Sequence, residues 1–132
     1  MEFFFDRNIA PMLVHELGQR GITALHHNDQ FDNKAGDPEI IEFVSAQQLV
    51  LVTYDRRIWR EHRDTLEIFR PRIMFLPRSI LNSKIEVQKG WFFHGWPRIA
   101  EKYGVLTPPA MVRVSASEDV EQIFFTSTLS EE

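Results

Sequence analysis

The chain has 132 residues, of which 43% are hydrophobic and 26% charged, with a formal net charge of −4 and no cysteine. These values are typical of a globular protein, and we expect a single domain over residues 1–132. The lack of cysteine excludes disulfides, thiolate metal ligands and thiol nucleophiles. No apolar stretch approaches the roughly 20 residues of a membrane span, and no secretory signal pattern opens the chain. We therefore expect a cytoplasmic protein with no membrane partner.

The first half of the sequence alternates between strand and helix patterns. Residues 2–5 form a short apolar run, and a helix is predicted from Ile9 to Arg20 with Asn8 as its N-cap. Residues 22–26 read as a strand and residues 28–36 as a loop. Asp37 is then predicted to cap a second helix, with Pro38 at its first position.

The second half continues the alternation. Residues 49–54 are predicted to form a strand, and this strand is too continuously apolar to have one face exposed to solvent. Such a strand is typical of the middle of a parallel sheet that is covered on both faces. One helix is predicted from Ile58 to Phe69, a strand over residues 72–76, and a helix over residues 85–103 that Gly95 and Pro97 kink or split. Two further strands, residues 111–117 and 121–127, are expected to pair as a hairpin or to join the sheet edge.

This order of elements predicts an α/β fold. It is a three-layer α/β/α sandwich with a mainly parallel central sheet and a C-terminal β-hairpin extension. Ligand sites in such sheets lie beyond the carboxyl ends of the strands. Asp6 and Asp55 each end a strand, so we expect their carboxylates to converge at that edge.

Two more acids, Asp37 and Glu39, open a helix that points back toward the same edge. Each acid also has a structural explanation: Asp37 as an N-cap, Glu39 at a helix dipole, and Asp6 and Asp55 as acceptors in tight turns. Together, however, two carboxylates about 5 Å apart repel by roughly 3 kcal/mol at a dielectric near 20. An all-oxygen cluster suits Mg²⁺ or Mn²⁺, which would activate water for phosphoryl displacement.

The charge of the chain is unevenly distributed. Seven arginines fall between residues 56 and 78 against three acids, whereas no Lys or Arg follows Arg113. Arg56, Arg57 and Arg60 directly follow the strand that ends at Asp55, and guanidinium groups bind phosphate in bidentate fashion. Carboxylates that can bind a metal lie beside arginines that can bind phosphate, and this combination indicates a nuclease. We expect these three arginines to contact RNA phosphates.

Two stretches, FFFDRNIAPMLVHELGQRGI and GDPEIIEFVSAQQLVLVTYDRRI, carry a recognisable pattern. A strand ends in Asp-x-Asn with Pro in the following helix, Asp-x-x-Ile opens the next helix, and an apolar strand ends in Thr-x-Asp. From Phe3 to about Ile58 the chain resembles the PIN-like domain family, specifically its short VapC-like bacterial branch. The resemblance implies a Mg²⁺- or Mn²⁺-dependent ribonuclease, often a toxin neutralised by an antitoxin. The family's acids fall on Asp6, Asp37 and Asp55, with Asn8 and Thr53 as supporting polar groups. We expect the three aspartates to hold the metal, with Glu39 as an auxiliary catalytic acid.

The pattern also departs from the family. Relatives often have a second acid two residues after the last aspartate, where this chain has Arg57, and Asp-Glu-Asn where it has Asp6-Arg7-Asn8. We predict a metal-dependent endoribonuclease, the toxin of a type II toxin–antitoxin pair. The alternative is a catalytically inactive PIN-like domain that binds RNA or protein. A phospho-acceptor receiver module is disfavoured, because it requires paired acids after the first strand and a lysine after the last.

Other residues carry less information. His26 and His27 lack the spacing of a metal pair and are read as structural, and His62 is read as a buried, hydrogen-bonded histidine. Residues 91–96 contain four aromatics, Trp91, Phe92, Phe93 and Trp96. Core packing is the first explanation, and a homodimer face or an antitoxin groove is the second.

Overall fold

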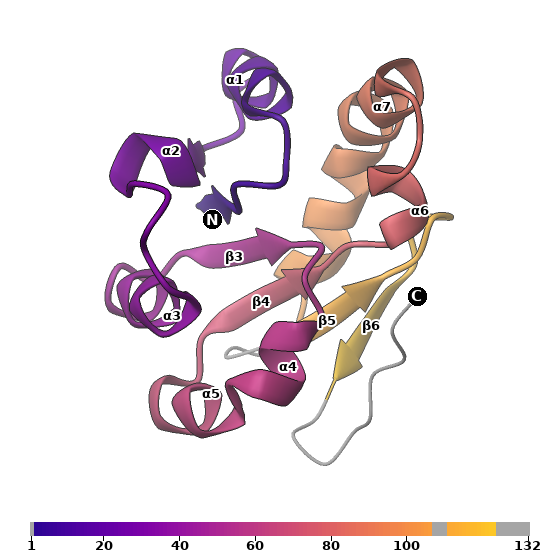
Figure 1. The fold of residues 1–132 in the computed structure, drawn as a ribbon. Coiled ribbons are helices and arrows are strands. Elements are labelled where there is room, and N and C mark those ends of the chain that lie inside the picture. Colours follow the sequence, from indigo (N-terminus) through magenta and orange to yellow (C-terminus); the bar gives the residue numbers. More distant parts are fainter. Residues whose placement is uncertain (1, 107–110, 124–132) are drawn as a thin grey trace.

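The computed structural model describes residues 2–106 and 111–123. Their strands form one six-stranded sheet in the order β2-β1-β3-β4-β5-β6 (Figure 1). All neighbours are parallel except β5 and β6, which form an antiparallel hairpin. The strands are β1 (Phe3–Phe5), β2 (Ala24–His26), β3 (Val50–Thr53), β4 (Arg72–Phe75), β5 (Met111–Val114) and β6 (Val120–Ile123).

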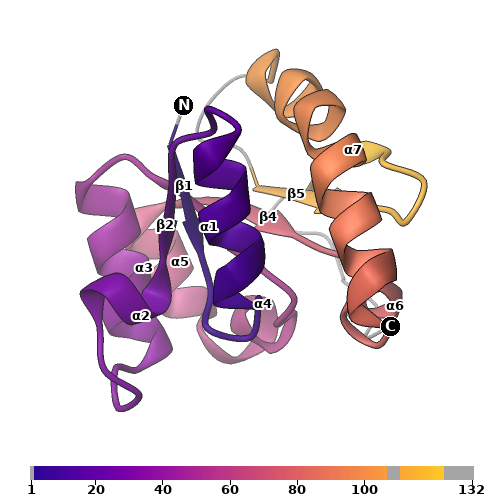
Figure 2. The same ribbon diagram turned by 90° about the horizontal axis from the view of Figure 1, so that it is seen from above.

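Helices cover both faces of the sheet. α1 and α7 lie over one face, whereas α3, α4 and α5 lie over the other (Figures 1 and 2). The helices are α1 (Pro11–Gln19), α2 (His27–Gln30), α3 (Asp37–Ala46), α4 (Arg57–Glu61), α5 (Arg63–Phe69), α6 (Arg78–Leu81) and α7 (Ile85–Gly104). The predicted α/β class, with its mainly parallel sheet and C-terminal hairpin, is confirmed.

Alternating side chains of the central strands enter two separate cores. Phe3 and Phe5 pack with the α1 and α7 side chains, whereas Phe4, between them, packs with the α3 side chains. Since successive side chains of a strand point to opposite faces, a strand covered on both sides must be apolar throughout. This explains the uninterrupted apolar runs of β1 and β3, whose residues are all buried.

The register of β1 and β3 brings their carboxyl ends together. Phe5 is paired with Val52, and the backbone N–H of Asp6 donates to the Val52 carbonyl at 3.0 Å. Asp6 and Thr53 therefore leave the sheet side by side, at the edge where open parallel sheets bind ligands.

Two predicted helix starts are wrong. α1 begins at Pro11 with Ala10 as N-cap, not at Ile9 with Asn8, because Ile9 N–H bonds the Asp6 carbonyl at 3.0 Å in a turn before the helix. α3 begins at Asp37, with Gly36 as N-cap and no side-chain capping bond. The carboxylate of Asp37 is therefore not used as the predicted cap.

Three other helical predictions also differ from the structure. The expected single helix over residues 58–69 is two helices, because His62 leaves helical geometry at φ −125° and ψ 33°. α7 is not split at Pro97, since Trp96 and Ile99 on either side are fully buried and hold the helix in place. The short helices α2 and α6 were not predicted.

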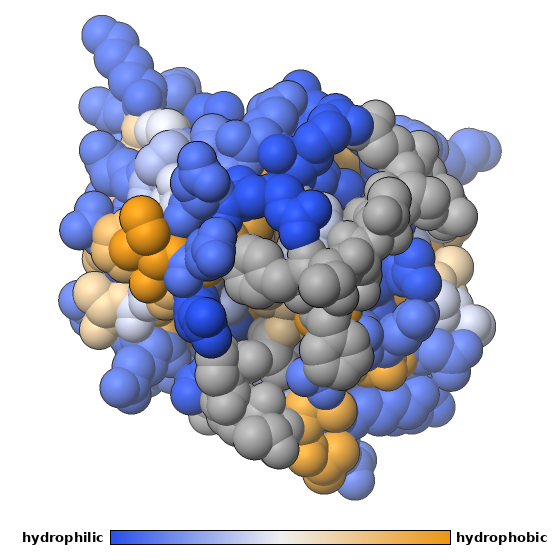
Figure 3. All heavy atoms as spheres, turned by 90° about the horizontal axis from the view of Figure 1, so that it is seen from below, coloured by the Kyte–Doolittle hydropathy of each residue, from blue (hydrophilic) through white to orange (hydrophobic). Residues whose placement is uncertain are grey.

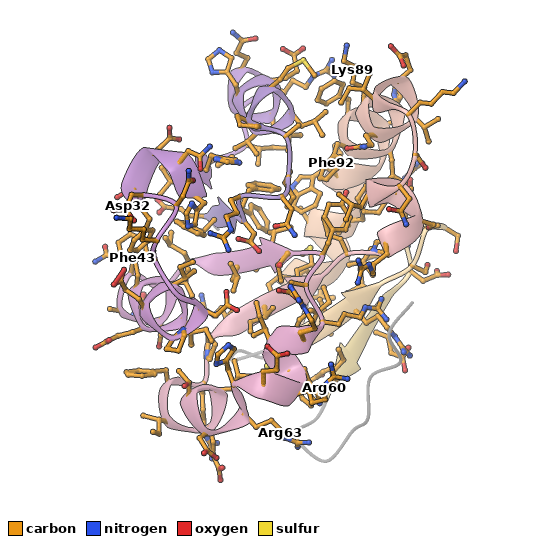
Figure 4. All side chains as sticks on the ribbon, viewed as in Figure 1. Asp32, Phe43, Arg60, Arg63, Lys89 and Phe92 are labelled. Carbon is orange, nitrogen blue, oxygen red and sulfur yellow. The ribbon has the colours of Figure 1, made fainter. Side chains whose placement is uncertain are left out.

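The aromatic residues of α7 pack in the core. Trp91, Phe92 and Trp96 are buried, and Phe93 is half-buried beneath the guanidinium of Arg20. Figure 4 shows Phe92 pointing inward from α7 while Lys89 points outward. Core packing therefore accounts for this group, and it does not supply an exposed aromatic face.

The face of the molecule that carries α3 to α5 is mainly hydrophilic where it is not covered by grey atoms (Figure 3). Figure 3 shows the face that carries α3 to α5, where apolar residues occupy only small areas outside the grey atoms. Within residues 2–106 and 111–123, no helix is both long and apolar enough to cross a membrane. The second predicted hairpin strand continues to residue 127, and its residues 124–127 lie outside the described residues.

Candidate functional site

Asp6 directly follows β1 and is only 7% exposed. Its Oδ1 accepts the backbone N–H of Arg7 at 2.8 Å, and its Oδ2 accepts the hydroxyl of Thr53 at 2.7 Å. A buried carboxylate is expensive unless it is hydrogen-bonded. These two bonds fix the direction of the Asp6 carboxylate.

Thr53 links Asp6 to Asp55. The fully buried Thr53 hydroxyl donates to Asp6, and the same oxygen accepts the backbone N–H of Asp55 at 3.0 Å. The Thr-x-Asp spacing allows this, because residues 53 and 55 enclose one turn at the end of β3. The two aspartates that end neighbouring strands therefore belong to one hydrogen-bond network.

Asp55 is paired with Arg57. The Nε and Nη2 of Arg57 donate to Oδ1 and Oδ2 of Asp55 at 2.9 and 3.1 Å, and the Arg57 backbone N–H donates to Oδ1 at 3.0 Å. Burial raises the pKa of Asp55, but the hydrogen bonds from Arg57 and the charges of Arg57 and Arg78 outweigh it. The net pKa is below the usual aspartate range, so this carboxylate is ionised at neutral pH.

Asp37, at the first position of α3, faces the same edge. Its Oδ2 lies 3.4 Å from the Nε2 of His62. Burial raises the pKa of Asp37, the charges of Asp55 and Asp6 raise it further, and His62 partly opposes them. The charges of Asp6 and Asp55 therefore both act on Asp37 at the carboxyl edge.

The structural explanations for single acids are also observed. Asp6 and Asp55 both accept backbone N–H groups in the turns that follow their strands. Glu39 is exposed in the first turn of α3, where an acid is favourable for the helix dipole. Asn8 is exposed in the turn after β1 and lines a small cavity beside Asp55.

The donor chemistry of this edge fits a hard divalent cation. Asp6, Asp37 and Asp55 offer only carboxylate oxygens, and such ligands suit Mg²⁺ or Mn²⁺. Within residues 2–106 and 111–123, however, no three acidic or histidine side chains are already arranged to hold a metal ion. Arg57 and His62 are the present partners of two of the three carboxylates, so a bound cation would have to replace them.

The three arginines predicted to contact RNA lie in different environments. Arg56 is 5% exposed, and it lines a cavity of about 370 Å³ between the end of β4 and the β5–β6 hairpin. Arg57 has an exposed side chain but is bonded to Asp55. Arg60 is exposed on α4, on the side of the molecule away from α1 and α7 (Figure 4).

The consecutive histidines have structural positions. His26 is buried, with its Nε2 2.7 Å from the Ile9 carbonyl, and its Nδ1 accepts the Asn28 N–H at the start of α2. His27 is fully buried, packed among the rings of Phe4 and Phe31.

Two residues of this edge were missed in the sequence. His62, read as a buried histidine, is partly exposed and contacts Asp37, which no local spacing indicates. Arg78 acts electrostatically on Asp55 from the start of α6. It could have been found, because it lies just beyond the carboxyl end of β4, the strand beside β3.

Comparison with known proteins gives one match. The family model described as "PIN like domain" matches residues 1–75, more than half of the chain. This range includes β1, α3, β3 and every residue of the acidic edge except Arg78. No curated protein matches the chain, and no solved structure matches it.

Proposed function

The chain belongs to the PIN-like domain family, a family that often contains nucleases, and on that premise we propose that it is a metal-dependent endoribonuclease. Asp6, Asp37 and Asp55 are the proposed metal ligands. Thr53 and Asn8 are the supporting polar groups, and Glu39 is an auxiliary acid at the start of α3.

The convergence of three aspartates is the observation that carries this proposal. Asp6 and Asp55 share Thr53 as a hydrogen-bond partner, and their charges raise the pKa of Asp37. Like charges at one edge are unfavourable without a cation nearby. Arg57 now neutralises Asp55, as a bound metal would.

Each residue has a distinct role in this proposal. Thr53 holds the Asp6 carboxylate in one orientation, and Arg57 neutralises Asp55 until a cation replaces it. Mg²⁺ or Mn²⁺, when bound, would activate a water and stabilise the charge on the phosphodiester oxygens. Arg56, Arg57 and Arg60 are the proposed contacts to RNA phosphates, and of these Arg57 and Arg60 are exposed.

We further propose that the protein belongs to the VapC-like branch and is the toxin of a type II toxin–antitoxin pair. The support is the sequence pattern of Asp6-x-Asn8 and Thr53-x-Asp55, together with the small α/β/α fold. Induced expression of the wild-type chain is then expected to arrest bacterial growth, whereas Asp6→Asn should not. Growth unaffected by the wild type would contradict the toxin role.

RNA cleavage tests the enzymatic proposal. Purified protein is incubated with single-stranded RNA and Mn²⁺, with EDTA or Asp37→Asn as the negative control and Glu42→Gln as a surface-charge control on α3. We expect cleavage by the wild type and by Glu42→Gln alone. Cleavage that survives EDTA or Asp37→Asn would indicate a contaminating nuclease or another site.

One observation favours a second candidate, a catalytically inactive PIN-like binding domain. The bidentate Arg57–Asp55 ion pair occupies the position where relatives often have a second acid. If catalysis has been lost through Arg57, the wild type should neither cleave RNA nor bind Mn²⁺, whereas Arg57→Asp should regain Mn²⁺ binding. Mn²⁺ binding by the wild type would exclude this explanation.

A further inference from the structure

A small cavity lies directly beside Asp55. Its volume is about 200 Å³, and it is lined by Asn8, Tyr54, Asp55, Arg57, Arg78 and Leu81. These residues come from the turn after β1, the segment that follows β3, the start of α4 and both ends of α6. The cavity therefore adjoins the acidic edge but is built in part from residues that the sequence pattern did not include.

The lining of the cavity is rich in hydrogen-bond donors. Arg78 is exposed at the start of α6, and among the described residues its guanidinium has no hydrogen bond or ion pair. The amide of Asn8 adds further donors. The Tyr54 hydroxyl, in the same wall, is buried and has no hydrogen-bond partner within the described chain.

The charges around the cavity favour an anion. Asp55 is the one acidic residue in the lining, and Arg57 already holds both of its carboxylate oxygens. Arg57 and Arg78 together carry two positive charges against the one negative charge of Asp55, so the lining of the cavity has a net positive charge. Guanidinium groups pair with phosphate through two parallel hydrogen bonds.

The size of the cavity narrows the choice of ligand. Sites that enclose a drug-sized ligand occupy about 300–1,000 Å³, so about 200 Å³ suits a single compact group better than a whole nucleotide. We propose that this cavity is a subsite for one RNA phosphate next to the phosphodiester that is cut, with Arg78 as its main contact. This inference rests on the proposed ribonuclease function.

RNA binding without metal tests the subsite. Fluorescence anisotropy of a labelled single-stranded RNA is measured in EDTA over a salt series for the wild type, Arg78→Gln and Arg70→Gln. Arg70 is a matched control, since it is an exposed arginine just before β4, at the opposite edge of the sheet. Both variants change the net charge equally.

We expect Arg78→Gln to weaken RNA binding roughly tenfold at low salt, as for one charged hydrogen-bonded contact. It should also reduce the slope of log Kd against log salt by about 0.7, the value for one phosphate on a single strand. Arg70→Gln should match the wild type. Inorganic phosphate should compete with RNA for the wild type and much less for Arg78→Gln.

The outcomes separate this subsite from the metal site. Equal RNA affinity for Arg78→Gln and Arg70→Gln would overturn the subsite, even if Mn²⁺ still stabilises both variants and the nuclease proposal stands. If Arg78→Gln weakens RNA binding but inorganic phosphate does not compete with RNA for the wild type, Arg78 contacts RNA outside the cavity. That result would also overturn the subsite. Failure of the wild type to bind RNA would contradict both proposals.

Discussion

The hydroxyl of Thr53 connects the two strands that carry the acidic edge. It donates to Oδ2 of Asp6 and accepts from the N–H of Asp55, and it is fully buried. A β-branched residue is typical of a strand, but only one with a hydroxyl can make both bonds. One side chain thus orients the Asp6 carboxylate and holds the backbone of Asp55.

Replacing this hydroxyl by a methyl group should therefore destabilise the protein. Thr53→Val keeps the shape but leaves a buried carboxylate oxygen and a buried N–H without partners, at a cost of about 1–3 kcal/mol. Urea unfolding monitored by circular dichroism measures the loss. Thr53→Ser, which retains the hydroxyl, should lose much less. Equal stability of Thr53→Val and the wild type would show that the bridge contributes nothing.

The opposite pKa shifts of Asp55 and Asp37 predict opposite effects of neutralisation. Because the pKa of Asp55 is lowered in the folded protein, its ionised form stabilises the fold at pH values above the ordinary aspartate pKa of 3.8. This stabilisation is lost as the pH falls through the pKa that Asp55 has in the folded protein. The raised pKa of Asp37 means that its ionised form is disfavoured in the fold once pH rises above 3.8.

At neutral pH without metal, we expect Asp55→Asn to unfold at lower urea than the wild type and Asp37→Asn to unfold at equal or higher urea. Both differences should shrink as the pH falls and the wild-type carboxyls become protonated, Asp37 before Asp55, because the pKa of Asp37 is raised and that of Asp55 is lowered. Unfolding curves at several pH values measure this. The reverse order of the two variants at neutral pH would contradict the charge arrangement described for the site.

At the scale of elements, α7 depends on close contact with the β5–β6 turn. A side chain on Gly95 would place its Cβ 2.5 Å from a carboxylate oxygen of Glu118, whereas one on Gly90 would meet nothing within 4 Å. The same carboxylate accepts from Arg98 at 2.9 Å. Gly95 thus lets the hairpin turn pack against the helix.

Alanine substitutions at these two glycines should change the stability of the protein in opposite directions. Gly90→Ala should stabilise the protein by about 0.5–1 kcal/mol, because alanine is the better helix former. Gly95→Ala should instead destabilise the protein, because the Glu118 carboxylate must move away from Arg98 to make room for the added methyl group. Thermal unfolding of both variants measures the difference. A similar stabilisation by Gly95→Ala would show that the turn adapts without cost.

The sequence predicted the sheet better than the ends and breaks of helices. Apolar runs such as residues 49–54 can only be strands covered on both faces, so β3 and its neighbours follow from local pattern. The break at His62 involves neither Gly nor Pro, so no local breaker signal in the sequence predicts it. Pro97 predicts an interruption of α7, but the helix continues through it because the buried side chain of Trp96 holds the helix in place.

The same distinction holds for the site. Asp6 and Asp55 could be placed at one edge because parallel strands share a carboxyl end. Thr53 was expected only as a supporting polar group, since its bond to Asp6 depends on the register between β1 and β3. The pairing of His62 with Asp37 joins residues 25 positions apart in sequence and follows from tertiary packing alone.

At the scale of the whole molecule, charged side chains lie together at the edge of the six-stranded sheet where the parallel strands end. Acids from β1, α3 and β3 meet arginines from α4 and α6 along this edge. The central claim is that the three carboxylates bind a divalent cation.

A thermal melt of the wild type and Asp6→Asn, each with and without millimolar Mn²⁺, tests that claim most directly and needs no knowledge of the RNA substrate. We expect Mn²⁺ to raise the wild-type midpoint, since ligand at 100 times its Kd contributes about 2.7 kcal/mol, and to leave Asp6→Asn unchanged. A wild type that does not respond to Mn²⁺, with Asp6→Asn merely less stable, would contradict the metal site and leave Asp6 as a residue of the turn after β1.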